Sequence, residues 1–257
     1  MKDKDDKQAM EVSAVDAEGQ AFRDKLEAMF RDNPVNEGDM LFNLGMFVRS
    51  SLLAKFLAMD DLYKRIVGIP GDIFEFGVWW GQNLVLMENL RAIHEPFNKE
   101  RRIIGFDTFT GYEGFTDRDV TGGVMTDGTY ATTHDYKEFL SQLLETHEGN
   151  NLLGHIRGSH KLIAGNVADT SGEYFEQHPE AIVALAYFDI GTYEPTRAAL
   201  EAIKPNLIPG SVILLDELTW SGSPGEAIAF KEVFRDMDYK IEKSLIYPSR
   251  SIVTVSG

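Results

Sequence analysis

The feature that most constrains the fold is an uninterrupted apolar segment, residues 181–188, in a chain of 257 residues. A strand whose side chains are all apolar must be covered on both faces, as the strands of parallel sheets are. The segment is far too short to cross a membrane, which takes roughly 20 apolar residues. Residues 212–215, which follow a Pro-Gly turn, form a second segment of this kind. We therefore expect a sheet that is covered by helices on both faces.

Strand-like and helix-like segments alternate over much of the chain. Further strands are predicted at residues 73–78, 102–106, 161–164, 239–246 and 251–255. Helices are predicted between strands at residues 82–92, 136–144, 195–203 and 227–234. This order predicts an α/β fold: a Rossmann-like, mostly parallel sheet of seven strands with helices on both faces. Ligands of such sheets bind beyond the carboxyl ends of the strands.

The remaining segments define the expected domain organisation. Residues 1–20 are polar and mixed in charge, and we expect a disordered leader there. Residues 21–68 carry apolar side chains at helical spacing and predict an N-terminal helical extension, followed by the main domain at residues 69–257. A loop insertion at about residues 110–134 is rich in glycine and threonine. It either closes over the site as a lid or is disordered.

The charge balance excludes several classes of function. The chain has 25 Lys and Arg against 41 Asp and Glu, a formal net charge of −16, and no cysteine. Such an acidic chain does not favour nucleic acid, and the lack of cysteine excludes disulfides, thiolate zinc sites and cysteine nucleophiles. No segment resembles a signal peptide or a membrane span. We therefore expect a cytoplasmic protein that acts on a small molecule; the helical extension leaves a homo-oligomer open.

A glycine-containing turn follows the first predicted strand. Glu75, Gly77 and Gly81 have the spacing ExGxxxG, and the next helix directs its free N–H groups toward this turn. The dinucleotide motif GxGxxG has a third glycine and no acid within the strand, so the spacing favours a nucleoside cofactor without a pyrophosphate. A NAD-dependent oxidoreductase is therefore the less favoured enzyme class. The alternative is that the glycines only allow close packing of strand and helix.

Three polar residues outside this turn are further candidates for cofactor binding. Asp107 ends the second strand, where an acid accepts both ribose hydroxyls in nucleotide-binding sheets, although such residues also serve as turns and caps. Asn166 follows the third strand and either reaches an adenine edge or forms a simple turn. Arg49, in the helical extension, either pairs with a cofactor carboxylate or lies on the surface.

Carboxylates also follow the fourth and fifth predicted strands. Asp189 ends the fourth, and Asp216 and Glu217 end the fifth. Adjacent strands lie about 4.8 Å apart, so the three carboxylates gather at one edge of the cleft if these strands pair. Like charges this close repel one another, and a divalent cation such as Mg²⁺ would relieve the repulsion. The alternative is a set of capping carboxylates that face water.

Taken together, these segments resemble a known family. The segments concerned are GDIFEFGVWWG (71–81), GFDTF (105–109), YFDIGTYEPT (187–196), PGSVILLDE (209–217) and PGEA (224–227). They are similar to those of the macrocin O-methyltransferase family, over about residues 40–240. The resemblance implies a class I methyltransferase fold, S-adenosylmethionine as cofactor, and methylation of a sugar or sugar-like hydroxyl in a biosynthetic pathway.

The resemblance also implies roles for individual residues. It assigns the cofactor to Glu75, Gly77, Gly81, Asp107 and Thr108. It assigns Mg²⁺ to Asp189, Asp216 and Glu217, and makes Asp189 and Glu217 candidates for catalytic residues. A hydroxyl bound to the metal would be more acidic, which would lessen the need for a protein base.

Two positions depart from the family pattern. Glu217 stands where the family usually has Asp, and Gly191 stands where the related pattern Asp-x-Asp has the acid that looks like the general base. The base is therefore open among Glu217, Glu194, Tyr193 and His134. Two other functions also stay open: methylation of a nitrogen, which needs little base assistance, and cofactor binding without catalysis.

Overall fold

The computed structural model describes residues 16–150, 160–247 and 249–257. The chain divides into two compact units, Met1–Phe56 and Leu57–Gly257. Most of the predicted leader, residues 1–20, lies outside the described residues. Helix α1 (Ala17–Arg31) begins within that range, because the Asp16 carboxylate accepts a hydrogen bond of 2.8 Å from the Gly19 N–H and caps the first turn.

The described part of the first unit is helical. It contains α1, α2 (Glu37–Asn43), the 3₁₀ helix η1 (Leu44–Phe47) and the first turns of α3 (Ser50–Ile66). Neither α1 nor α2 has a buried side chain. Among the described residues, no single helix has the length and apolarity needed to span a membrane; one bent pair, Glu37–Phe47 with Ser50–Ile66, passes by length and composition alone.

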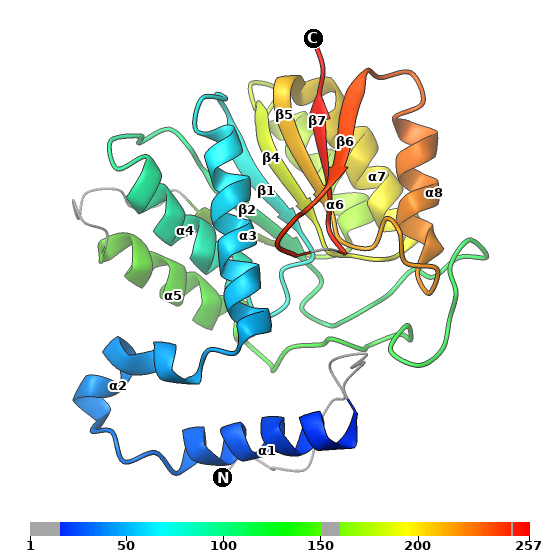
Figure 1. The fold of residues 1–257 in the computed structure, drawn as a ribbon. Helices are drawn as coiled ribbons and strands as arrows, with labels where there is room; N and C mark the ends of the chain where they lie inside the picture. Colours follow the sequence, from blue (N-terminus) through cyan, green and yellow to red (C-terminus); the bar gives the residue numbers. More distant parts are fainter. Residues whose placement is uncertain (1–15, 151–159, 248) are drawn as a thin grey trace. The chain divides into compact units, whose positions relative to one another are not determined.

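A seven-stranded sheet forms the centre of the second unit (Figure 1). Its strands are β1 (Asp72–Phe76), β2 (Ile103–Asp107), β3 (His160–Ala164), β4 (Val183–Phe188), β5 (Leu207–Leu215), β6 (Tyr239–Lys243) and β7 (Ser251–Val255). In the order β3-β2-β1-β4-β5-β7-β6, the neighbours from β3 to β5 are parallel, and β7 is antiparallel to β5 and β6. The predicted fold class is confirmed.

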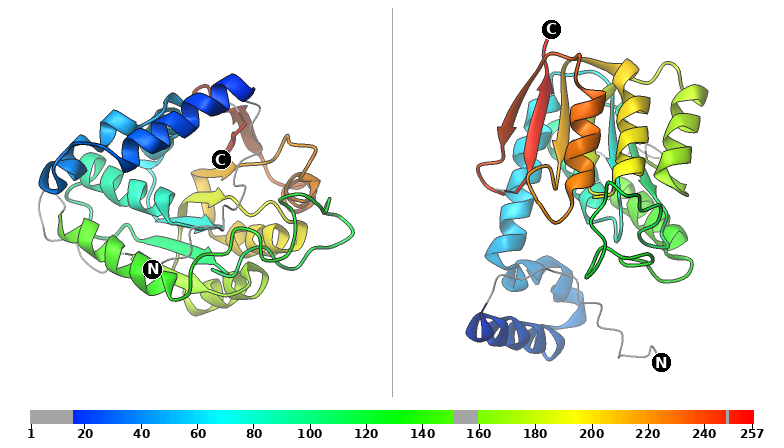
Figure 2. Two further views of the ribbon diagram at one scale, coloured as in Figure 1. Left: turned by 90° about the horizontal axis from the view of Figure 1, so that it is seen from below. Right: turned by 90° about the vertical axis from the view of Figure 1, so that its right-hand side faces the viewer.

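Helices cover both faces of this sheet (Figures 1 and 2). One face carries α6 (Val167–Gln177), α7 (Tyr193–Ile203) and α8 (Pro224–Val233); the other carries α4 (Gln82–His94), α5 (Tyr136–Gly149) and the last turns of α3. Strand β4 is buried at every position. Phe188 lies in one core and Tyr187 in the other, which is why this strand is apolar throughout.

Two elements differ from the sequence prediction. The sequence does not predict α6, whose polar residues obscure the helical spacing; Asn166 is its N-cap and accepts a hydrogen bond of 2.9 Å from the Ala168 N–H. Strand β5 begins earlier than predicted, so that Pro209 and Gly210 lie within it. A register shift between β4 and β5 accommodates them.

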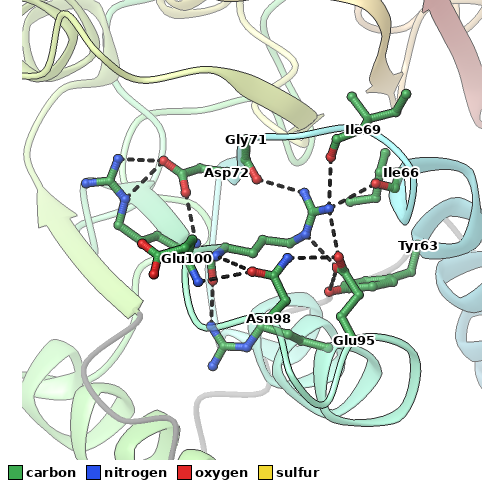
Figure 3. Close-up of polar contacts among 11 residues, drawn as sticks. Tyr63, Ile66, Ile69, Gly71, Asp72, Glu95, Asn98 and Glu100 are labelled. Carbon is green, nitrogen blue, oxygen red and sulfur yellow. Dashed lines mark hydrogen bonds and ion pairs between the residues drawn. The ribbon is translucent and has the colours of Figure 1, made fainter.

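A buried arginine fixes the amino-terminal end of β1 (Figure 3). The guanidinium of Arg101 donates hydrogen bonds of 2.7 to 2.9 Å to the carbonyls of Ile66, Ile69 and Gly71. It also pairs with Glu95, just beyond α4. Because Ile66 ends α3 and Gly71 precedes β1, this single side chain ties two helices to the first strand.

Candidate functional site

The strand order reverses at β1 and β4, and the carboxyl ends of these strands are where sheets of this kind bind ligands. The turns after the two strands touch there: a Cβ at Gly77 would lie 2.1 Å from the carbonyl oxygen of Asp189. Gly77 also has a φ of 92°, which L side chains rarely adopt. Glycine at this position therefore lets the turn after β1 lie against the acid-bearing turn after β4.

Asp107, at the end of β2, holds the turn after β1 in place. Its Oδ2 accepts hydrogen bonds from the N–H groups of Val78 (2.6 Å) and Trp79 (2.7 Å), and its Oδ1 accepts one from Phe109 (2.6 Å). These bonds stabilise Trp79 at a φ of 49°, a strained conformation for a bulky residue. Asp107 thus shapes the turn, which is the local role that the sequence analysis gave as its alternative, and its contact with a cofactor stays a prediction.

Glu75 and Gly81 flank the same turn. Glu75 is buried in β1, and its Oε1 accepts a hydrogen bond of 2.7 Å from the Asn83 side chain, in the first turn of α4. Gly81 is the N-cap of α4, and a Cβ there would lie 2.4 Å from the Leu140 side chain of α5. Gly81 is therefore also needed for close packing. The structure brings Glu75, Gly77, Gly81 and Asp107 together around one turn.

The other predicted cofactor residues have local partners or lie in the first unit. The Thr108 hydroxyl donates a hydrogen bond of 2.7 Å to the Gly111 carbonyl. Asn166 caps α6, so its side-chain oxygen serves the local role that was its alternative. Arg49 belongs to the first unit, and its contact with the cofactor stays a prediction.

A cavity of about 460 Å³ opens beside the end of β2. It is lined by Phe109, Thr110, Ala164 and residues 131–138. His134, at this cavity, is 92% exposed and pairs with the exposed Asp135. A histidine in this environment is solvated, which weighs against His134 as the base.

The three predicted acids after β4 and β5 have different surroundings. Asp189 is exposed. Asp216 is buried and forms an ion pair with the Arg250 guanidinium, just before β7. Glu217 is partly buried; burial raises its pKa to about 7, against the opposing effect of a hydrogen bond with Ser223.

Gly191 accounts for the position of Glu217. A Cβ at Gly191 would lie 2.4 Å from Oε2 of Glu217 and 3.2 Å from the hydroxyl oxygen of Ser223. The Glu217 carboxylate therefore occupies the space that a side chain at position 191 would fill. The two departures from the family pattern are thus one exchange, in which a longer acid at 217 replaces a side chain missing at 191.

Two residues that the sequence analysis did not assign belong to the same place. Glu226, in the first turn of α8, is fully buried and accepts a hydrogen bond of 2.9 Å from the Glu217 N–H; burial raises its pKa well above the usual range. The pKa of Tyr112 is raised by burial and then by the charges of Glu217, Asp189 and Glu226. We call Asp189, Glu217 and Glu226 the acidic cluster.

Comparison with known proteins agrees with this geometry. The sequence model of the family Macrocin-O-methyltransferase (TylF) matches residues 14–246. The chain belongs to the macrocin O-methyltransferase family. The resemblance seen in the sequence is confirmed, and with it membership of a family of methyltransferases.

Three known proteins extend this comparison. The structure of the calicheamicin methyltransferase CalS11 is 34% identical, with a TM-score of 0.87 and 94% of both chains covered. A tetracenomycin-C derivative 4'-O-methyltransferase from Streptomyces olivaceus is 28% identical over 152 residues. That match covers 58% of this chain and 54% of the relative, about half its length. The O-methyltransferase NovP, 16% identical with a TM-score of 0.59, shares the fold.

In this member of the macrocin O-methyltransferase family, the predicted Mg²⁺ ligands do not form a cation site as they are placed. Asp216 is paired with Arg250, and Glu217 lies beside the Ser223 hydroxyl, which donates its hydrogen bond to the Gly191 carbonyl. Residues 16–150, 160–247 and 249–257 contain one group of three possible metal ligands whose atoms lie within 4.8 Å of one another, and none of the three predicted Mg²⁺ ligands belongs to it. The metal assistance expected from the sequence is untested, and it would require Asp216 to leave Arg250.

That other group is a buried ion network. It contains Glu88, Glu148 and His160. The guanidinium of Arg91 pairs with Glu88 at 2.6 Å and lies 3.7 Å from Glu148, so a protein cation already lies beside both acids.

The remaining candidates for the base make other contacts. The Tyr193 hydroxyl donates a hydrogen bond of 2.6 Å to Glu232 of α8. Glu194 pairs with Arg197, one turn along α7, at 3.3 Å. These contacts weigh against both residues as the base and leave Glu217 as the candidate with the most suitable surroundings.

Proposed function

We propose that this chain is an S-adenosylmethionine-dependent O-methyltransferase that acts on a hydroxyl of a sugar or sugar-like acceptor. The observation that carries the proposal is the contact between the turn at Gly77 and the turn at Asp189. The residues of the first turn would hold a methyl donor close to the acid-bearing turn after β4. Positioning of this kind supplies much of the rate in a displacement reaction.

The cofactor is assigned to Glu75, Gly77, Gly81 and Asp107, with Thr108, Asn166 and Arg49 as further candidates. The residues fit this group because the buried Glu75 carboxylate, beside the turn that Gly77 and Gly81 allow to pack closely, favours a cationic ligand nearby. When bound, S-adenosylmethionine supplies a methyl group on a positively charged sulfur.

Glu217 is the proposed general base. It takes the proton of the acceptor hydroxyl as the hydroxyl oxygen bonds to the methyl carbon and the carbon–sulfur bond breaks. A pKa of about 7 suits a base that works near neutral pH. The exchange with Gly191 supports this role, because it puts a carboxylate where the family pattern has an acid. We route no step through a metal, because Asp216 is already paired with Arg250.

The sugar acceptor is supported by the relatives and by the aromatic residues near the site. A second structure of CalS11, 32% identical with a TM-score of 0.81 and covering 94% of this chain and 96% of that chain, is described as a TDP-rhamnose 3'-O-methyltransferase in calicheamicin biosynthesis. Tyr130 lies between Tyr112 (5.3 Å between ring centroids) and Trp79 (5.6 Å). Aromatic faces suit the apolar face of a sugar ring.

Calorimetry with S-adenosylhomocysteine and a methyl-transfer assay with TDP-rhamnose test this proposal. We expect saturable binding, weakened at least about tenfold in Asp107→Ala because the turn loses its charged hydrogen-bond acceptor. Asp127→Ala, an exposed acid in the loop, is the matched control. Absence of binding at high micromolar concentration would overturn the cofactor. Binding without transfer to any sugar hydroxyl would favour a nitrogen acceptor or a non-catalytic protein.

A further inference from the structure

Helix α7 is capped by a residue from a distant loop. Its own N-cap residue, Thr192, makes no side-chain capping hydrogen bond. Instead, Oδ1 of Asp119 accepts a hydrogen bond of 2.7 Å from the Tyr193 N–H, across 74 positions of sequence. The first N–H groups of a helix have no partner within the helix and favour negative charge, so a carboxylate is well suited to this place.

Neighbouring residues hold the Asp119 side chain in the position of this contact. Its Oδ2 accepts hydrogen bonds from the N–H (2.8 Å) and the hydroxyl (2.9 Å) of Thr116, which fixes the carboxylate within the loop. In α8, a Cβ at Gly225 would lie 2.3 Å from Oδ1 of Asp119 and 2.6 Å from the Tyr193 nitrogen. The cap therefore requires the absence of a side chain at Gly225. Figure 2 shows the loop, in green, reaching α7 and α8.

The same loop also contains Tyr112. The two limbs of the loop are joined at Tyr112, whose N–H donates to the Thr129 carbonyl and whose carbonyl accepts from the Gly128 N–H, both at 2.9 Å. The Tyr112 ring also contacts Phe115 (5.9 Å) and Tyr130 (5.3 Å). Phe115 immediately precedes the segment that Asp119 anchors, so displacement of that segment also displaces Tyr112.

We infer that Asp119 is a positioning residue for the acceptor: by capping α7 beside Gly225, the neighbour of Glu226, it holds the 110–134 loop, which includes Tyr112, against the carboxyl ends of the strands. The inference rests on the proposed function and adds to it that the 110–134 loop forms one wall of the acceptor site. The ligand that this wall suits is a hydroxyl-bearing ring, which packs against Tyr112 while one hydroxyl faces Glu217. The cofactor turn is held separately by Asp107.

The kinetic test compares Asp119→Ala with Asp119→Asn and with Asp117→Ala, an exposed acid two positions away. We expect Asp119→Ala to lower kcat/KM for the acceptor about tenfold, and the dissociation constant of S-adenosylhomocysteine to stay within about twofold. Asp119→Asn should retain part of the activity, because its amide oxygen still accepts from the Tyr193 N–H while its amide nitrogen cannot accept from the Thr116 N–H. Asp117→Ala should match the wild type.

Hydrogen–deuterium exchange of the 110–134 loop tests the cap without turnover. We expect faster exchange in Asp119→Ala than in the wild type, an intermediate rate in Asp119→Asn, and wild-type exchange in Asp117→Ala. Unchanged exchange in Asp119→Ala would overturn the inference, and so would faster exchange with unchanged kcat/KM. Equal losses of acceptor turnover and S-adenosylhomocysteine binding would also overturn it. A wild type that binds S-adenosylhomocysteine but transfers no methyl group would contradict the proposed function. The exchange data would then still test whether Asp119 holds the loop against α7.

Discussion

At the scale of single residues, the pair Gly191 and Glu217 determines where a base can lie. In the sequence, each is a separate departure from the family pattern, and the missing acid at 191 raises the question of lost catalysis. In the structure, the Glu217 carboxylate lies 2.4 Å from where a Cβ of residue 191 would be. The sequence does not contain this distance, because it depends on how the loops after β4 and β5 face each other.

We therefore expect Glu217→Gln to lower kcat at least about 100-fold, since a positioned base contributes that much or more. In the wild type, kcat should rise as the pH increases through about 7, because the base is active when deprotonated. The variant should lose this dependence. Initial rates measured between pH 5.5 and 8.5 check both. Glu194→Gln, which removes an acid paired with Arg197, is the control and should behave as the wild type.

The variant Gly191→Asp distinguishes a catalytic site from one that has lost catalysis. The new side chain would meet Glu217 and Ser223, at a backbone φ of 74° that non-glycine residues rarely adopt. We expect at least about tenfold lower turnover, because a second acid displaces or repels the base. A gain of activity in this variant would show that position 191 lacks a needed acid and would contradict the assignment of Glu217.

Asp216 leads to an expectation about metals. Its ion pair with Arg250 neutralises the acid that was predicted to bind Mg²⁺. We expect methyl transfer to be unchanged by a chelator and by added Mg²⁺, measured after extensive dialysis. Loss of activity with the chelator and its recovery with Mg²⁺ would show that the ion pair opens to admit the ion.

At the scale of elements, the sequence predicts those strands and helices whose apolar residues are buried in a regular pattern. Strands β4 and β5 are recognisable because both of their faces are covered, and their apolar residues leave little choice. Helix α6 escapes prediction because only some of its residues meet the core, Tyr174 and Phe175 among them. The cap on α7 escapes prediction because Asp119 is distant in sequence. Contacts between polar groups depend on tertiary arrangement and leave no periodic pattern.

Arg101 illustrates such a contact and gives a prediction for stability. Its guanidinium is buried together with Glu95 and joins α3, α4 and β1 (Figure 3). We expect Arg101→Met to lower the free energy of unfolding by about 3–5 kcal/mol, because it leaves a buried carboxylate and three carbonyls without their donor. Urea denaturation measures the change. Arg197→Met, which removes an exposed ion pair, is the control and should cost less than about 1 kcal/mol.

At the scale of the whole molecule, the net charge of −16 is distributed unevenly. Several buried acids are matched by a protein cation. The pairs are Asp72 with Arg102, Glu95 with Arg101, and Asp216 with Arg250. In the acidic cluster, by contrast, burial raises the pKa values of Glu217 and Glu226. The composition shows the acidic excess, and only the fold separates acids that are neutralised from acids that are available for chemistry.

The network around His160 makes the stability of the whole molecule depend on pH. His160 Nδ1 lies 2.9 Å from Glu148 Oε1, and this hydrogen bond raises the pKa of His160 above 6.5, with further contributions from Glu88 and Glu145 and an opposing one from burial. A pKa raised by folding means that the contribution is complete below pH 6.5 and is lost as the pH rises through the folded-state pKa. We expect His160→Gln to remove about 1 kcal/mol of stability at pH 5.5 and much less at pH 8.5, as measured by urea denaturation.

The control is His134→Gln. It removes a histidine that also pairs with an acid but is exposed, so it should change stability little at either pH. Equal losses for His160→Gln at both pH values would show that its role is packing and not charge.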